Sequence, residues 1–166
     1  MYKGAEVDRA EKQGATPLYI ACQEGHLEIA QLLSSYGAAR DFTIDADTHH
    51  LRTAEFISTY FGHAALTAWL VLSRHWTPLH HIEVLTKERT KALLRAGADP
   101  RASPAAGVPS PAERARTAPE TEVQKMVLRA AEPWSPDNHE FFPAAARARA
   151  VWVCHVGNRL ANTRFG

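Results

Sequence analysis

Nine histidines are the residues of this 166-residue sequence whose type could most readily bind a metal or transfer a proton. They include two adjacent pairs, His49-His50 and His80-His81. Adjacent residues on a helix point about 100° apart, so a single pair rarely chelates a metal, and structural zinc sites need more ligands at defined spacings. The histidines therefore predict neither a metal site nor a cofactor.

The two cysteines, Cys22 and Cys154, are the candidate nucleophiles. They show no CxxC spacing, and Cys22 stands beside small apolar residues without a neighbouring His–acid pair to activate its thiol. The chain also lacks the P-loop, GxGxxG, GxSxG and HExxH patterns. We expect no catalytic residues and a protein that is not an enzyme. The enzyme alternative requires a cleft in which titratable groups converge.

Charge offers few further functions, because the net charge is only +1. Four arginines near the C-terminus could form a phosphate-binding patch, namely Arg147, Arg149, Arg159 and Arg164. Basic residues on the outer face of a helix are usually its solvated side, so no nucleic-acid partner is predicted. The N-terminus is polar, and the most apolar run, residues 64–72, is too short to span a bilayer. We expect a soluble cytoplasmic or nuclear protein with no membrane partner.

Residues 14–38 carry the clearest structural pattern of the chain, with the sequence GATPLYIACQEGHLEIAQLLSSYGA. Thr16 can cap a helix that starts at Pro17, a residue with no amide hydrogen to leave unpaired. Gly25 and Gly37 can adopt the left-handed conformation that ends a helix. Apolar residues at helical spacing then give each of two helices one buried face.

This stretch resembles one ankyrin repeat, whose pattern is G-x-T-P-L-H-x-A-A-x-x-G-H-x-x-x-V-x-x-L-L-x-x-G-A. The matching residues are Gly14, Thr16, Pro17, Leu18, Ala21, Gly25, His26, Leu32, Leu33, Gly37 and Ala38. The resemblance implies an all-α solenoid of helix–turn–helix units joined by short hairpin loops. In this family the side chain at the position of His80 makes hydrogen bonds within and between repeats.

Weaker copies of the pattern follow. Thr53 and Gly62-His63 repeat the spacing of Thr16 and Gly25-His26 after 37 residues, four more than the usual period, which predicts an insertion in the intervening hairpin. Residues 77–80 read TPLH, and Ser110-Pro111 begins a degenerate unit. We predict a repeat array over residues 1–131, divided into 1–12 (partial), 13–49, 50–74, 75–106 and 107–131.

Residues 132–166 are predicted to form a separate helical tail. Its start, EPWSPDNHEFFP, resembles a WSPxxHxxFP tail that follows ankyrin repeats in algal and protist proteins and implies no function. Pro143 then starts a helix over residues 144–162, whose apolar stripe is Ala145, Ala148, Trp152, Val156 and Leu160. We expect this C-terminal helix to cap the last repeat, since terminal units of a solenoid must cover its core.

Protein binding on the concave face is the function that the resemblance implies. The family's variable contact positions fall on Gln13, Gln23, Glu24, Arg52, Tyr60, Phe61 and Trp76. Tyr60, Phe61 and Trp76 are the expected anchors, because exposed aromatic side chains dominate many interfaces. An equal alternative is that these three rings pack in the eroded joint between the second and third repeats.

The predicted protein is a monomeric adaptor or scaffold with an unknown protein partner. One alternative is a substrate-recognition subunit of a ubiquitin ligase that docks through its C-terminal helix. An exposed stripe on that helix would favour docking, and a stripe buried on residues 123–128 would argue against it. Another alternative is a decaying repeat fragment without activity and of marginal stability.

Overall fold

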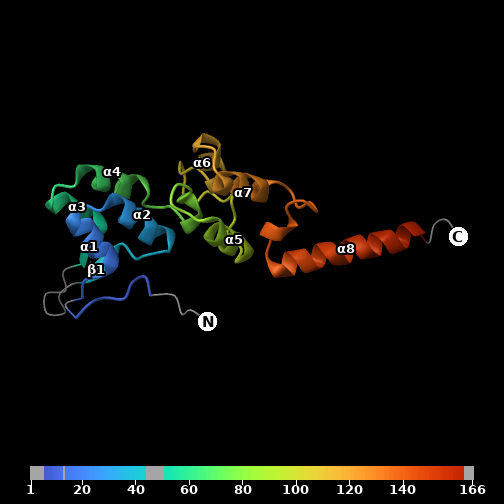
Figure 1. Ribbon diagram of the computed structural model, residues 1–166, viewed down its shortest axis with the longest axis horizontal. Coiled ribbons are helices and arrows are strands. Elements are labelled where there is room, and N and C mark those ends of the chain that lie inside the picture. The colour runs from blue at the N-terminus through green and yellow to red at the C-terminus, as the bar shows by residue number, and fades with distance from the viewer. Residues whose placement is uncertain (1–5, 13, 44–50, 163–166) are drawn as a thin grey trace. The chain divides into compact units, whose positions relative to one another are not determined.

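The computed structural model describes residues 6–12, 14–43 and 51–162 (Figure 1). Helices dominate this part of the chain, as the sequence predicts. They are α1 (Pro17–Glu24), α2 (Leu27–Ser35), α3 (Ala54–Tyr60), α4 (Ala64–Leu72), α5 (Lys87–Arg95), α6 (Pro111–Thr117), α7 (Glu122–Ala131) and α8 (Ala144–Asn162), with 3-10 turns η1 (Pro78–His80) and η2 (His139–Phe141). Strands β1 (Asp41–Thr43) and β2 (Leu51–Thr53) pair antiparallel and form the expected hairpin.

The chain divides into two compact units that interleave in sequence. Unit 1 comprises residues 1–85 and 103–109, and unit 2 comprises residues 86–102 and 110–166. The boundary between residues 131 and 132, and the limits of the individual repeats, stay predictions.

Hydroxyl caps set the starts of the helices. The side chains of Thr16, Thr53, Thr86 and Thr121 each accept a hydrogen bond from the amide three residues later. Ser110 forms a capping box with Glu113, whose carboxylate accepts from the Ser110 amide at 2.7 Å and its hydroxyl at 2.8 Å. These two bonds hold the pKa of Glu113 below its usual value. The local signals predicted from the sequence therefore start helices where expected.

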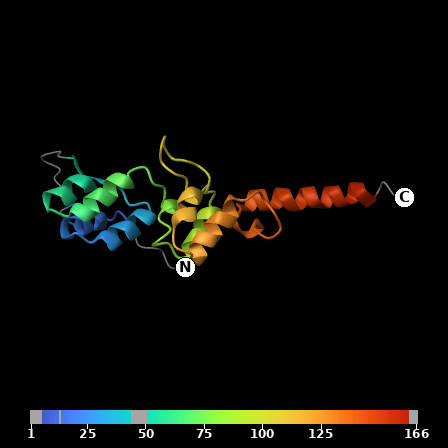
Figure 2. The same ribbon diagram turned by 90° about the horizontal axis from the view of Figure 1, so that it is seen from above.

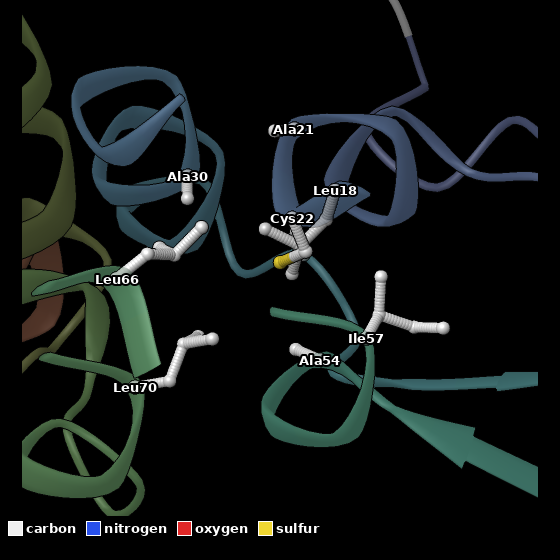
Figure 3. Close-up of a cluster of buried hydrophobic side chains, with 9 residues drawn as sticks. Leu18, Ala21, Cys22, Ala30, Ala54, Ile57, Leu66 and Leu70 are labelled. Carbon is white, nitrogen blue, oxygen red and sulfur yellow. The ribbon is translucent and has the colours of Figure 1, made fainter. Parts of the chain in front are cut away.

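In unit 1 the helix pair α1–α2 packs against the helix pair α3–α4, and the four helices lie together in both views (Figure 1, Figure 2). Figure 3 shows the shared core, in which α1 and α2 face α3 and α4. Its largest side chains, Leu18, Ile57, Leu66 and Leu70, are at most 1% exposed. Burial of such side chains stabilises the folded state by roughly 1.5–3 kcal/mol each, so the two helix pairs form one stack.

Arg40 joins the start of the hairpin to the end of α4. Its guanidinium donates to the Leu70 carbonyl and the Ser73 hydroxyl, both at 3.0 Å, and lies 5.2 Å from the ring centre of Trp69. The Arg40 contacts satisfy carbonyl and hydroxyl groups that the C-terminal end of a helix would otherwise expose. Burial lowers the pKa of Arg40, and the nearby Glu55 carboxylate opposes that effect.

The third unit of the array does not repeat the shape of the first two. Where the first two units have the helices α1 and α3, the chain after Thr77 makes only the turn η1. The amides of Val84 and Leu85 then both donate back to the His81 carbonyl at 3.1 Å. His80 is fully buried: its Nδ1 accepts from the Thr77 amide at 3.0 Å, so its Nε2 carries the proton and donates to the Pro109 carbonyl at 3.0 Å. The position implied by the TPLH resemblance thus carries the expected hydrogen bonds.

Unit 2 packs α5 against α7 and α6 against α7, and η2 lies on α5. The turn before η2 is held by Asn138, which is 1% exposed and donates to the carbonyls of Arg129 at 3.1 Å and Pro133 at 2.9 Å. Phe141 is 4% exposed, and Lys91 pairs with Glu140. The segment with the WSPxxHxxFP pattern therefore covers this end of the described array.

The C-terminal helix forms where predicted, but its predicted capping contact is wrong for the side chains that the structure describes. Ala145, Ala148 and Trp152 of the apolar stripe are all exposed, Trp152 by 66%. The side chains of Val156 and Leu160 lie outside the described residues. The physical reason is that Asn138 and Phe141 already occupy the surface of the last helices, so the stripe is not needed there.

Candidate protein-binding surface

Three aromatic side chains gather on α3 and the residue after it, and we call Phe56, Tyr60 and Phe61 the aromatic patch. The rings of Phe56 and Tyr60 stack with centres 6.2 Å apart, and Phe61 meets Tyr60 edge-on at 5.1 Å. Their exposed fractions are 50%, 72% and 46%, so much of this apolar surface faces solvent. The patch exists because residues four apart share one helix face, which brings Phe56 beside Tyr60.

Phe56 is the member of the patch that sequence reasoning missed. It stands 37 residues after Tyr19, at a position that the family pattern does not treat as variable, so the mapping of contact positions passed over it. Its spacing of four residues from Tyr60 was the available signal.

Gln23 and Glu24 occupy the positions on α1 that correspond to Tyr60 and Phe61. Glu24 is exposed, and the Gln23 amide donates to its carboxylate at 3.1 Å. His63 Nε2 donates to the Gln23 carbonyl at 2.7 Å, which fixes the end of α1 against the turn after α3. Since α1 and α3 pack side by side, these four predicted residues share one edge of unit 1.

Trp76, a further predicted residue, does not join this edge. Trp76 is half-buried, and its ring packs on Trp69, His80 and His81 at centre distances of 6.5, 6.1 and 5.4 Å. Trp76 therefore packs inside the joint, as the alternative interpretation expects, whereas Tyr60 and Phe61 do not. Gln13 and the Arg52 side chain lie outside the described residues. Binding by any of the seven stays a prediction.

Of the two candidate nucleophiles, the structure describes the side chain of Cys22, and its surroundings disfavour the reactive thiolate. Cys22 is fully buried, and burial raises the pKa of its thiol to about 12, although Arg40 acts in the opposite direction. A neutral buried thiol is a weak nucleophile.

Other candidate sites are equally poor in reactive groups. Across the described ranges, no three His, Cys, Asp or Glu side chains are grouped so that they could hold a metal ion. A cavity of about 230 Å³ in unit 2 has Asp99 and Arg101 as its ionisable lining groups. Within the same described ranges, no helix combines the length and apolar character needed to cross a membrane.

Comparison with known proteins identifies the fold. The family model described as "Ankyrin repeats (3 copies)" matches residues 1–103. The chain belongs to the ankyrin repeat family. The all-α repeat fold implied by the sequence resemblance is thus confirmed, and ankyrin repeats imply a protein–protein interaction module.

Two curated ankyrin relatives match a short part of the chain. Human protein phosphatase 1 regulatory subunit 27 is 48% identical over 42 residues, and the mouse protein of the same name is 45% identical over 42 residues. Each match covers 25% of this chain and 27% of the relative, so the chain spans about a quarter of the curated relatives' length. No solved structure matches this ankyrin chain significantly.

Proposed function

We propose that this ankyrin chain is a non-enzymatic adaptor or scaffold that binds a protein partner through the aromatic patch and the adjoining Gln23 and Glu24. The observation that carries this proposal is the exposure of three mutually packed rings on α3, led by Tyr60 at 72%. Exposed aromatic clusters on soluble proteins mark interaction surfaces, because burying them against a partner removes apolar area from water.

The chemistry of the edge specifies the kind of partner. Three rings supply rigid apolar area, and the exposed Glu24 carboxylate supplies a negative charge on the neighbouring helix. A partner segment with a bulky apolar side chain and a nearby lysine or arginine fits both features.

The relatives suggest one partner to test directly. Both are named regulatory subunits of protein phosphatase 1, and a regulatory subunit acts by binding rather than by catalysis. The short alignment supports the phosphatase only as a candidate partner for this chain.

The test is quantitative affinity capture from cytoplasmic and nuclear extracts with the 166-residue chain as bait. The variants Tyr60→Ala and Phe61→Ala remove patch rings, and Trp152→Ala is the matched control, since it removes another exposed ring from α8. A true partner should bind the wild type and Trp152→Ala equally and lose roughly 30-fold in affinity with Tyr60→Ala, which corresponds to about 2 kcal/mol. If every captured protein binds both patch variants as tightly as the wild type, the proposal is wrong.

A second candidate function is favoured by α8. Its exposed Ala145, Ala148 and Trp152 are what a docking helix would present, as in the ubiquitin-ligase subunit considered above. The same capture experiment separates the two functions. Loss of a ligase subunit with Trp152→Ala and not with Tyr60→Ala would support docking through α8.

A decaying fragment without activity is the remaining alternative. A stable fold is favoured instead by the capped helix starts, the partly buried Arg40 hydrogen bonds and the closed core of unit 1. Circular dichroism during heating is the check: a cooperative helical transition is expected, and a broad or absent one would support the fragment.

A further inference from the structure

The interface between α1–α2 and α3–α4 in unit 1 shows which residues join two such helix pairs. The same positions recur on the outer surfaces of both pairs. Residues of α3–α4 repeat those of α1–α2 after 37 positions, so Ile57, His63 and Leu66 correspond to Ile20, His26 and Ile29. On one side of the interface, Ile57 and Leu66 are 0% and 1% exposed. On the other side, Cys22 and Ala30 are both fully buried in the same core (Figure 3).

His63 and Gly25 hold the two helix pairs together at this interface. The ring of His63 lies where a side chain on Gly25 would be, because a Cβ there would come within 2.4 Å of His63 Nδ1. From that position His63 Nε2 donates to the Gln23 carbonyl at 2.7 Å. Gly25 thus provides the space and Gln23 the acceptor for the histidine of the next helix pair.

The corresponding surface of α3–α4, which we call the seat, is uncovered. A shallow cavity of about 400 Å³ is lined by Thr59, Gly62, Ala64, Thr67 and Ala68. These five residues stand 37 positions after Cys22, Gly25, Leu27, Ala30 and Gln31. Within that earlier set, Cys22 and Ala30 lie in the core shared with α3–α4, and Gly25 lies against His63. A Cβ on Gly62 would meet nothing within 4 Å, whereas the same atom on Gly25 would meet His63.

The matching projections on α1–α2 are also uncovered. Ile20 is 44% exposed and Ile29 is 48% exposed, although their counterparts Ile57 and Leu66 are buried. His26, the counterpart of His63, is exposed as well. Unit 1 therefore presents both halves of its own internal interface on two different surfaces.

We propose that a second copy of this chain occupies the cavity, with Ile20, His26 and Ile29 of one copy seated on Thr59, Gly62 and Ala68 of the next. The spacing of the three projections matches the cavity because the same spacing already fits inside each molecule. His26 would donate to the carbonyl of Tyr60, which corresponds to Gln23. The contact joins two different surfaces, so it leads to open head-to-tail chains rather than a closed dimer.

The seat differs from its counterpart on α1–α2 in ways that make the association reversible. Thr59 and Thr67 replace Cys22 and Ala30, and their hydroxyls bond inside α3–α4, Thr59 to the Glu55 carbonyl at 2.7 Å and Thr67 to the His63 carbonyl at 3.1 Å. Both threonines still line the cavity, with the two alanines. The seat is thus apolar but less so than the internal one, and we expect concentration-dependent association.

Sedimentation velocity of the 166-residue chain tests this, at concentrations from about 1 µM to about 1 mM, the range of weak to moderate affinities. Ile29→Arg blocks the projecting surface, and Ala68→Arg blocks the seat. Each variant alone should weaken association by at least about tenfold. An equimolar mixture should form dimers that do not grow, because each variant keeps one intact surface. Val151→Arg is the matched control, since it changes an exposed apolar residue on α8, and it should associate like the wild type.

Three results would overturn the proposal: a wild type that stays monomeric throughout, association that neither blocking variant weakens, or variants that fail to complement each other. Circular dichroism spectra confirm that the variants fold, and Ile29→Ser replaces Ile29→Arg if that variant does not. Self-association and partner binding depend on different side chains, so failure of this inference and failure of the proposed partner site are distinguishable.

Discussion

Replacing Gly25 and Gly62 by alanine, one at a time, tests how the two helix pairs are joined. The two glycines have nearly the same left-handed backbone, with φ of 76° and 80°. Alanine in this conformation costs about 1 kcal/mol at either position. Only at Gly25 does the added Cβ meet another residue, the ring of His63 at 2.4 Å, so the pair isolates that contact.

The expected difference in stability between the two variants follows from the contacts that His63 would lose. A Cβ at 2.4 Å forces the ring to move, which breaks the 2.7 Å bond to the Gln23 carbonyl at a cost of about 1 kcal/mol. Displacing a packed ring adds roughly 1–3 kcal/mol of overpacking strain. Gly25→Ala should therefore lose about 2–4 kcal/mol more stability than Gly62→Ala, which lowers the melting temperature by roughly 10 °C more.

The assay is urea unfolding followed by circular dichroism, with hydrogen exchange on peptides from residues 14–43 to place the loss in unit 1. In the double variant Gly25→Ala/His63→Ala the ring is absent, so its stability should be higher than the sum of the single effects predicts. Equal destabilisation by the two glycine variants would refute the reasoning, because it would mean that His63 does not lie against Gly25.

Two further changes probe the buried groups of each unit. The thiol of Cys22 is kept neutral, so its stabilising contribution is present below its unfolded pKa of about 8.5 and is lost as pH rises toward its folded pKa of about 12. In urea unfolding from pH 7 to pH 11, roughly that titration range, the wild type should lose stability relative to Cys22→Ala, and a constant difference would contradict this account. In unit 2, Phe141→Ala should lower the free energy of unfolding by about 3 kcal/mol, because a ring that is 4% exposed leaves a cavity. Phe142→Ala, at a half-buried neighbour, should cost less in thermal unfolding, and an equal cost would show that Phe141 is not the anchor.

Local features of the fold were predictable because each rests on one or two residues. Thr16 and Thr86 cap helices through their own hydroxyls, and Pro143 allows α8 to start at Ala144 whatever lies around it. The resemblance implied a hairpin between the first two repeats, and strands β1 and β2 pair there; the spacing between Thr16 and Thr53 predicted an insertion in that hairpin.

Packing of the aromatic and apolar residues was not predictable in the same way. Trp76 and Tyr60 are both aromatic and flank the same joint. Trp76 nevertheless packs on Trp69, whereas Tyr60 stays 72% exposed. The stripe on α8 has the period of a buried face, but a period does not say which surface will cover it. Asn138 holds the segment before η2 through three hydrogen bonds of its side-chain amide, and the type of this residue alone did not predict which main-chain atoms it would bond.

The interleaving of the two units separates the order of synthesis from the order of assembly. A nascent chain ending at residue 85 already contains α1–α4, yet His80 still lacks the Pro109 carbonyl to which its Nε2 donates. Residues 86–102, which belong to unit 2, must leave the ribosome before that acceptor does. At ordinary elongation rates this delay lasts about 1–5 s, far longer than a helix pair needs to form. Unit 1 therefore passes through a state in which its helices are folded while the loop around His80 is unfinished.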